Sequence, residues 1–69
     1  MSEFDVSLPS VRQVQAWIKE KHPVEIKLVN GDVLLGSILW QDQNCICLDS
    51  QGQKTMAYRQ AIAYVQPKG

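Results

Sequence analysis

Apolar residues near the start of the chain recur at helical spacing. They fall at positions i, i+3, i+6 and i+7 of one stripe, which consists of Val11, Val14, Trp17 and Ile18. This spacing predicts a helix from Val11 to Lys21. Ser10 and, three residues later, Gln13 form a Ser-x-x-Gln pattern, which predicts a capping box at the helix start. Pro23 sets the end, because the residue before a proline avoids the α region.

From Val24 onward the apolar period changes to two, as in half-buried strands. Five short segments are predicted as strands: 24–28, 33–40, 45–48, 55–59 and 62–65. Asn30-Gly31 between the first two predicts a hairpin turn, since both residues tolerate positive φ. Gly36 inside the second strand predicts a sharp bend or a close approach of another backbone.

One helix followed by five short strands predicts a mainly β protein, folded as a strongly bent five-stranded antiparallel barrel. The chain has 69 residues, enough for one domain. We expect a flexible N-terminal arm over residues 1–9, the domain over 10–67 and a C-terminal tail of 68–69. The last two strands carry few charges to block pairing at their edges. Edge-to-edge assembly into a closed ring is therefore expected.

Charge and hydropathy narrow the possible functions. Seven basic and seven acidic residues give a net charge of zero, which excludes a strongly basic nucleic-acid binder but not a local basic ring on an assembly. No apolar run approaches the roughly 20 residues of a membrane-spanning helix, so no membrane partner is expected. The first ten residues contain Glu3 and Asp5 and no basic cluster, unlike a signal peptide. We expect a cytoplasmic location, which also suits two unpaired cysteines.

Neither a metal site nor catalysis is predicted. Cys45 and Cys47 stand two apart on a strand and share one face, so we interpret them as small buried side chains. His22, the lone histidine, lies more than 20 residues upstream and is interpreted as a surface or capping residue. A structural metal site commonly needs four ligands, which these three residues do not supply. The sequence also contains no nucleophile–base pair and no glycine-rich phosphate loop. We expect no cofactor and no enzymatic activity.

Two segments carry a family resemblance. Leu28–Gly31 followed by Gly36, Ile38 and Asp42 looks like the first Sm motif, and Met56–Ile62 looks like the second. The chain resembles the Hfq family of Sm-like RNA chaperones from the helix to Pro67, and its details resemble the divergent cyanobacterial branch. This resemblance implies a homohexameric ring of Sm-like barrels that regulates messages after transcription. Asp42 itself is expected to fix backbone N–H groups of a turn.

In the family, uridine-rich RNA ends bind around the pore on the proximal face, where the helices lie. Gln43 matches the family's glutamine there, whereas Asn44 stands where the family has a stacking aromatic residue. Arg59 and Gln60 replace the family's lysine and histidine, and Ser10 stands at the position of a base-reading glutamine. Six Arg59 side chains around one pore would repel each other unless an anion neutralised them, which favours Arg59 as a ligand residue.

The other two family surfaces are altered as well. On the rim, which promotes annealing in the family, the matching positions are Gln15, Ile18, Lys19 and Lys21. Lys19 and Lys21 fit an ordinary solvated helix face as well as an RNA site. On the distal face, A-rich RNA binds in the family. Here Lys27 replaces the tyrosine that stacks on adenine, and Asp32 replaces a neighbouring apolar residue. Leu34 still matches an apolar residue of that face.

The aromatic residues bear on affinity. Trp17 belongs to the apolar stripe, Trp40 is expected to be partly exposed, and Tyr58 is expected at the subunit contact together with Ile62 and Tyr64. No stacking platform comparable to the family's remains, so we expect weakened RNA affinity. Two functions stay open: a ring that binds RNA, with U-rich sequences favoured, or a ring whose altered surfaces dock a partner protein.

Overall fold

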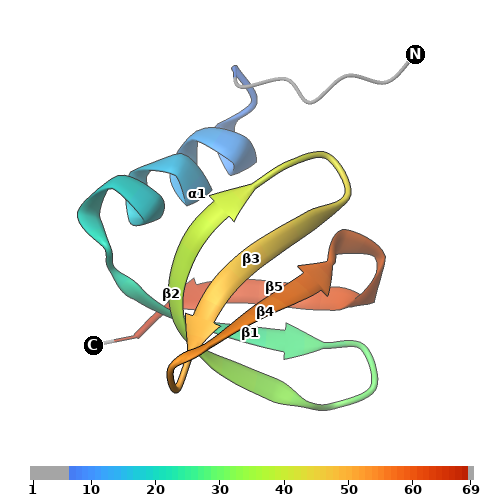
Figure 1. The fold of residues 1–69 in the computed structure, drawn as a ribbon. Coiled ribbons are helices and arrows are strands. Elements are labelled where there is room, and N and C mark those ends of the chain that lie inside the picture. Colours follow the sequence, from blue (N-terminus) through green and yellow to red (C-terminus); the bar gives the residue numbers. More distant parts are fainter. Residues whose placement is uncertain (1–6, 69) are drawn as a thin grey trace.

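The computed structural model describes residues 7–68 and shows one helix against a strongly bent antiparallel sheet (Figure 1). The elements in chain order are α1 (Pro9–Glu20), β1 (Pro23–Leu28), β2 (Val33–Gln41), β3 (Cys45–Ser50), β4 (Gln53–Tyr58), the 3₁₀ helix η1 (Arg59–Ala61) and β5 (Ile62–Pro67). The strand order is β4-β3-β2-β1-β5, which leaves β4 and β5 at the edges. The predicted fold class is confirmed, and the ring remains a prediction.

The start of α1 differs from the prediction. The capping box at Ser10 is wrong: the helix begins at Pro9, and the capping residue is Leu8, whose side chain makes no capping hydrogen bond. Pro9 has a fixed φ and no N–H, and both properties suit the first helical position. The first turn then closes through the Arg12 N–H, which donates to the Leu8 carbonyl over 2.9 Å. Of the predicted arm, residues 1–6 lie outside the described residues, and Pro9 belongs to α1.

The end of α1 is set by Lys21, which adopts a left-handed conformation with φ of 54°. The N–H of Lys21 donates to Ile18 O over 3.2 Å, and the N–H of His22 donates to Trp17 O over 3.0 Å. These two bonds satisfy carbonyl groups that a helix end otherwise leaves open. His22 therefore serves as a capping residue through its backbone.

The hairpin between β1 and β2 is confirmed, with a different turn from the one expected. Gly31 has φ of 100°, while Asn30 does not take a positive φ. The Gly31 N–H donates to Leu28 O over 2.9 Å, and the Leu28 N–H donates to Asp32 O over 2.8 Å. The loop is thus three residues long, and it needs a glycine at its last position.

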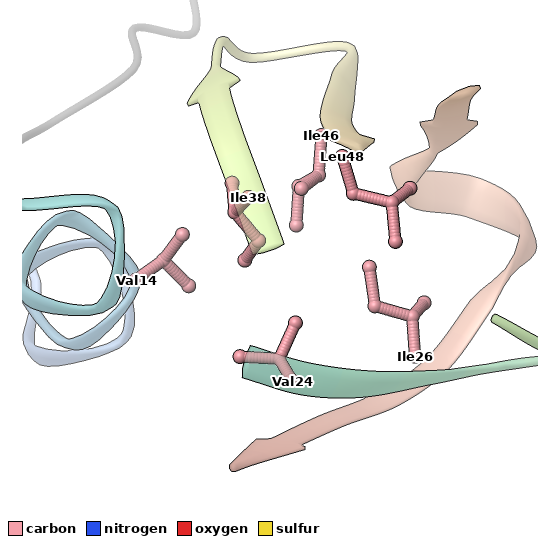
Figure 2. Close-up of a cluster of buried hydrophobic side chains, with 6 residues drawn as sticks. All are labelled: Val14, Val24, Ile26, Ile38, Ile46 and Leu48. Atoms are coloured by element: carbon pink, nitrogen blue, oxygen red, sulfur yellow. The ribbon is translucent and has the colours of Figure 1, made fainter. Parts of the chain in front are cut away.

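The core lies between α1 and the concave side of the bent sheet (Figure 2). Its six buried residues come from α1 and the first three strands: Val14, Val24, Ile26, Ile38, Ile46 and Leu48. Trp17 and Ile18 of α1 pack against this cluster, as the apolar stripe predicts. The helix is therefore held on the barrel mainly by burial of its apolar face.

Gly36 permits a close approach of two strands. A Cβ atom at this position would lie 2.1 Å from the backbone oxygen of Asp49 on β3. The predicted close approach of another backbone is confirmed. It lets β2 and β3 curl tightly around the core, because no side chain separates them here.

Cys45 and Cys47 are both buried and free of disulfide bonds, as predicted. Burial, with a further contribution from the Asp42 carboxylate, raises the pKa of Cys45. This thiol therefore stays protonated and acts as a small apolar side chain.

The predicted strand 55–59 is wrong at its end, because Arg59 opens η1. Its N–H donates to the Asn44 carbonyl over 2.9 Å, and its carbonyl accepts the N–H of Ile62. This short turn reverses the chain from β4 into β5. At the other end of β5, the Lys68 N–H donates to Pro23 O over 2.9 Å and ties the chain end to β1.

Candidate nucleic-acid interface

A hollow of about 270 Å³ lies between the loop after β2 and the start of η1. Its lining consists of Gln43, Asn44, Tyr58, Arg59 and Gln60. Two segments that are far apart in the sequence thus meet in one place. The structure brings together four of the five residues that the sequence assigns to the proximal pore, and Ser10 is the exception.

Asp42 gives the loop before β3 its shape. Its Oδ1 accepts hydrogen bonds from the backbone N–H of Asn44 over 2.8 Å and of Cys45 over 2.9 Å. The Asp42 N–H in turn donates to Cys45 O over 3.0 Å. The N–H groups of Cys45 and then Asn44 stabilise the ionised carboxylate and lower the pKa of Asp42. Asp42 fixes the turn as predicted and so positions Gln43 and Asn44.

Arg59 is half-buried, and it is hydrogen-bonded to the end of β2 and to the loop that follows β2. Its Nε donates to the Asp42 carbonyl over 2.8 Å, and a terminal nitrogen of its guanidinium donates to Oε1 of Gln41. The backbone N–H of Arg59 also donates to Asn44 O, so both the backbone and the side chain of Arg59 are fixed to this loop. The hollow therefore has a positively charged wall of defined position.

Gln41, the last residue of β2, is a site residue that the sequence analysis missed. Its Nε2 donates to Oε1 of Gln15 over 2.8 Å and to Val11 O over 3.3 Å, while its Oε1 accepts from Arg59. One amide thus connects α1, the end of β2 and η1. In the sequence, a polar residue next to Asp42 at the end of a strand is only a weak sign of a functional role, because polar residues are common where a strand ends and a turn begins.

Ser10 lies at a second, larger hollow of about 390 Å³ between α1 and β5. Trp17, Ile62 and Val65 contribute apolar surface there, and Arg59 lines both hollows. Ser10 is therefore near Arg59 across a largely apolar groove rather than in the polar hollow.

The residues predicted for the rim have different surroundings. Gln15 and Lys19 are exposed on α1, and Lys21 is exposed at its end. Ile18, at the second rim position, packs against the core, so that position serves the fold. Gln15 is bonded to Gln41, which links the rim to Arg59.

The residues predicted for the distal face do not all share one side of the sheet. Lys27 is half-buried on β1 and pairs with Val33 and Tyr64. Leu34 packs against the core with its partner Ile26, on the opposite side of the sheet from Lys27.

Asp32, also predicted for the distal face, is exposed in the hairpin loop. Its N–H donates to Oδ1 of Asn30 over 2.9 Å, and its Oδ2 accepts from Nδ2 of Asn30 over 3.2 Å. Asp32 therefore places a negative charge at the end of the β1–β2 hairpin.

The residues predicted for the subunit contact lie near the two sheet edges. Tyr58, at the end of β4, is 60% exposed, and Ile62, at the start of β5, is half-buried. Tyr64 donates a hydrogen bond through its hydroxyl to Oε2 of Glu25 over 2.9 Å. Trp40 is 43% exposed, as expected for the end of the second strand.

Two further features concern residues 7–68, namely metal binding and membrane insertion. No group of three or more His, Cys, Asp or Glu side chains that could hold a metal ion occurs in this range. No helix in the described part of the chain has the length and apolar character needed to cross a membrane.

Comparison with known proteins agrees with the motifs. Residues 8–67 match the family described as Hfq related. A relative from Caulobacter sp., called RNA-binding protein Hfq, is 40% identical over 63 residues, which cover 91% of this chain and 70% of the relative. A relative of the same name from Cereibacter sphaeroides is 43% identical over 49 residues, which cover 71% of this chain and 64% of the relative's length.

Two solved structures share the fold. The crystal structure of an Hfq protein from Anabaena sp. superposes with a TM-score of 0.82, and its sequence is 54% identical to this chain. The match covers 88% of this chain and 98% of the Anabaena chain. The structure of a pleiotropic translational regulator, also called Hfq, is 23% identical with a TM-score of 0.80, and covers 83% of this chain and 95% of the other. The second likeness concerns the fold alone. Both agree with the expected Sm-like barrel.

Proposed function

Because the chain belongs to the Hfq-related family, we propose that it binds uridine-rich single-stranded RNA in the hollow beside Arg59 and regulates messages after transcription. The observation that carries this proposal is the convergence of Gln43, Asn44, Arg59 and Gln60 on one hollow. The relatives from Caulobacter and Cereibacter, whose names state RNA binding, support the same class of ligand.

The chemistry of the hollow suits a uracil base next to a phosphate. Uracil offers two carbonyl acceptors and one N–H donor, and the amides of Gln43, Asn44 and Gln60 supply both donors and acceptors. The guanidinium of Arg59 supplies a fixed positive charge for a phosphate. Since Asn44 offers no ring for stacking, we propose an affinity below that of a site with an aromatic residue there, where stacking contributes about 1–3 kcal/mol per base.

The proposed assembly is a homohexameric ring in the cytoplasm. β4 and β5 are the edge strands, and the outer side of β4 presents Met56 and Tyr58 to solvent. The apolar groove with Ile62 and Val65 lies beside β5. Exposed apolar side chains near one edge and a groove near the other suit a head-to-tail contact that closes into a ring. Such a ring would place six Arg59 residues around one pore.

The test is a fluorescence-anisotropy titration of short oligo-U RNA at near-physiological salt, with the wild type and Arg59→Ala. Binding at micromolar strength or tighter that Arg59→Ala abolishes supports the proposal. Binding that appears only far below physiological salt overturns it and favours a ring that docks a partner protein, since non-specific phosphate contacts weaken steeply with salt. Analytical ultracentrifugation of the same samples tests the assembly, which fails if the wild type sediments as a single chain.

A further inference from the structure

Large apolar residues are exposed along the outer, convex side of β2, the central strand of the sheet. Val33 and Leu35 face outward, because Leu34 between them packs against the core. Towards the end of the strand, Leu39 and Trp40 are exposed as well. These four residues, here called the β2 stripe, are each between 39% and 47% exposed. An exposed apolar surface that runs the length of a strand is typical of an interaction site.

A β-bulge extends the stripe to the end of β2. The register between β2 and β3 shifts, so that Ile38 pairs with Leu48 and Trp40 pairs with Cys47. Ile38 and Leu48 face the core, whereas Cys47, as the neighbour of Leu48 in the strand, lies on the outer side of β3. The extra residue of the bulge therefore turns Trp40 outward beside Leu39. In a regular strand, Trp40 would share the side of Ile38.

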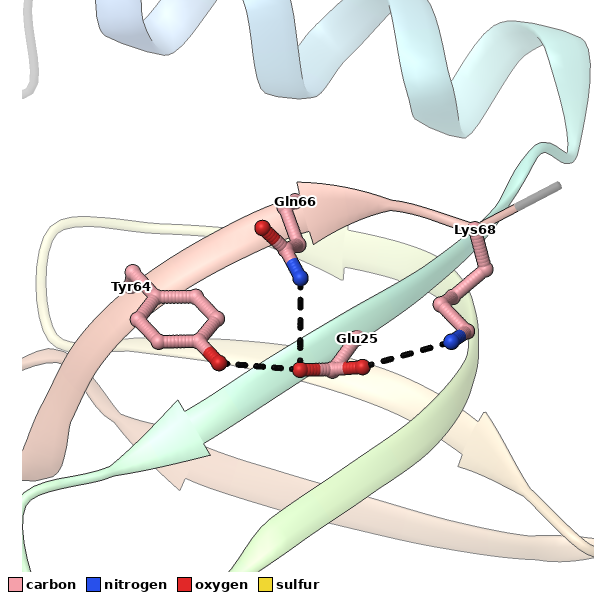
Figure 3. A network of polar contacts seen from close by, with 4 residues as sticks. All are labelled: Glu25, Tyr64, Gln66 and Lys68. Carbon is pink, nitrogen blue, oxygen red and sulfur yellow. Dashed lines mark hydrogen bonds and ion pairs between the residues drawn. The ribbon is translucent and has the colours of Figure 1, made fainter.

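The flank of the stripe on β1 is rigid and has its charge matched. Glu25, the cross-strand neighbour of Leu35, accepts hydrogen bonds from the Tyr64 hydroxyl over 2.9 Å and from Nε2 of Gln66 over 3.3 Å (Figure 3). Its Oε1 lies 3.5 Å from Nζ of Lys68. The Tyr64 bond, opposed by some desolvation and aided by Lys68, lowers the pKa of Glu25. Glu25 is thus ionised at neutral pH, and Lys68 balances its charge.

The charges around the β2 stripe are balanced as a whole. The basic residues are Lys27, Lys54 and Lys68, and the acidic residues are Glu25, Asp32 and Asp49. Nucleic-acid interfaces are much more positively charged than this. Equal numbers of opposite charges instead suit a second copy of the same face, which such a face does not repel.

The distribution of these charges also suits a self-complementary contact. Lys27 lies on β1, opposite Val33, and Asp49 lies on β3, opposite Ser37, so the two charges are on different sides of the stripe. A two-fold axis along the stripe puts β1 of one copy over β3 of the other. Lys27 of one copy then comes to the side of Asp49 of the other, as an isologous interface requires.

We propose that the β2 stripe binds the β2 stripe of a second copy of this chain, face to face about a two-fold axis. The proposed ring uses the edge strands β4 and β5, so the stripe lies away from the ring contacts, and the same binding stacks two rings. A stable interface buries about 800 Å² on each partner. Six stripes on one ring act together, so each needs to supply only part of this area. The inference uses the proposed ring and does not depend on RNA binding.

The experiment measures the mass of ribonuclease-treated protein by sedimentation equilibrium over a wide range of concentration. The wild type should reach twice the mass of its ring. Leu35→Glu should stay at the mass of one ring, because its carboxylate would be desolvated in the contact. Leu35 is exposed, so this change leaves the core intact. The control is Lys19→Gln on the exposed side of α1, which changes the net charge by the same amount and should double like the wild type.

Leu39→Ser tests the same contact without a new charge. It should weaken the association of rings at least about tenfold, because a large apolar side chain is no longer buried. High salt should not dissolve the wild-type double ring, since salt screens charges and not apolar contacts.

The outcomes separate this inference from the proposed ring. A wild type that stays a single ring at all concentrations, or a Leu35→Glu variant that still doubles, overturns this inference alone. Doubling that is lost after ribonuclease treatment also overturns it and assigns the face to RNA. A wild type that sediments as a single chain overturns both the ring and the stacking. A pair of chains that Leu35→Glu separates overturns the ring and supports the contact between stripes.

Discussion

The guanidinium of Arg59 donates a hydrogen bond to Oε1 of Gln41, which lies 18 residues earlier in the chain. The Gln41 amide also donates to Gln15 and to Val11 O of α1. The position of the charged wall of the hollow thus depends on contacts between the helix and the end of β2. A ligand residue that is held before binding costs less entropy when the ligand arrives.

We therefore predict that Gln41→Leu weakens oligo-U binding by about three- to tenfold, as expected for a net hydrogen bond of about 0.5–1.5 kcal/mol. The loss should be smaller than that of Arg59→Ala, because the charge remains. Anisotropy titration measures it. The matched control is Gln53→Leu at the far end of β4. Equal affinities of wild type and Gln41→Leu would show that Gln41 does not position Arg59 for RNA.

Much of the fold follows from local patterns. The apolar stripe that includes Val14 and Trp17 located the helix, and Asn30-Gly31 located the first hairpin. The errors arose where two local signals competed. Ser10 is a good capping residue, but Pro9 before it is a better first helical residue.

The site was less predictable than the fold. The motifs indicated Gln43, Arg59 and Gln60, and the structure gathers them. The role of Gln41 rests on hydrogen bonds that span 26 and 18 residues, and no local spacing encodes such contacts. In the same way, the hydrogen bond from the Tyr64 hydroxyl to Glu25 spans 39 residues.

Gly36 should be the least replaceable glycine in the described sheet. We predict that Gly36→Ala destabilises the fold by about 3 kcal/mol, since its methyl group would meet the Asp49 backbone oxygen, which cannot move without shifting β3. Urea denaturation followed by tryptophan fluorescence, at fixed protein concentration, measures the loss. The control is Gly52→Asn, which has open space and a left-handed conformation that asparagine tolerates, with a cost under about 1 kcal/mol. Similar stabilities for the two variants would contradict the close approach.

The Asp42 turn predicts a dependence of stability on pH. The N–H groups of Cys45 and Asn44 lower the pKa of Asp42 in the folded chain. The ionised Asp42 carboxylate therefore contributes its full stabilisation of the fold at pH values above the unfolded pKa of about 3.9. That contribution is lost as the pH falls through the lowered folded pKa. Asp42→Asn keeps an acceptor oxygen but cannot ionise. It should be less stable than the wild type at pH 7, and the gap should close below pH 4. A gap that stays constant from pH 7 to pH 3 in urea titrations would refute this.

The last prediction concerns the missing stacking group of the hollow. Asn44 is exposed, and its backbone N–H and C=O carry the loop hydrogen bonds, so a new side chain can leave these bonds intact. Asn44→Phe should tighten oligo-U binding by at least about fivefold, because one stacked base contributes about 1–3 kcal/mol. This gain should not depend on pH between 6 and 8.

Gln60→His adds a group that titrates near neutral pH, with an ordinary pKa of about 6.5. Its protonated form brings a second positive charge beside Arg59, so the gain should be larger at pH 6 than at pH 8. The double variant Asn44→Phe, Gln60→His should show both gains in anisotropy titrations, and the control RNA is oligo-A. Tighter oligo-U binding with unchanged oligo-A binding would place the uridine site in this hollow. An unchanged oligo-U affinity in the double variant would mean that uridine is not bound beside Asn44 and Gln60, and that the low aromatic content of the hollow does not limit affinity.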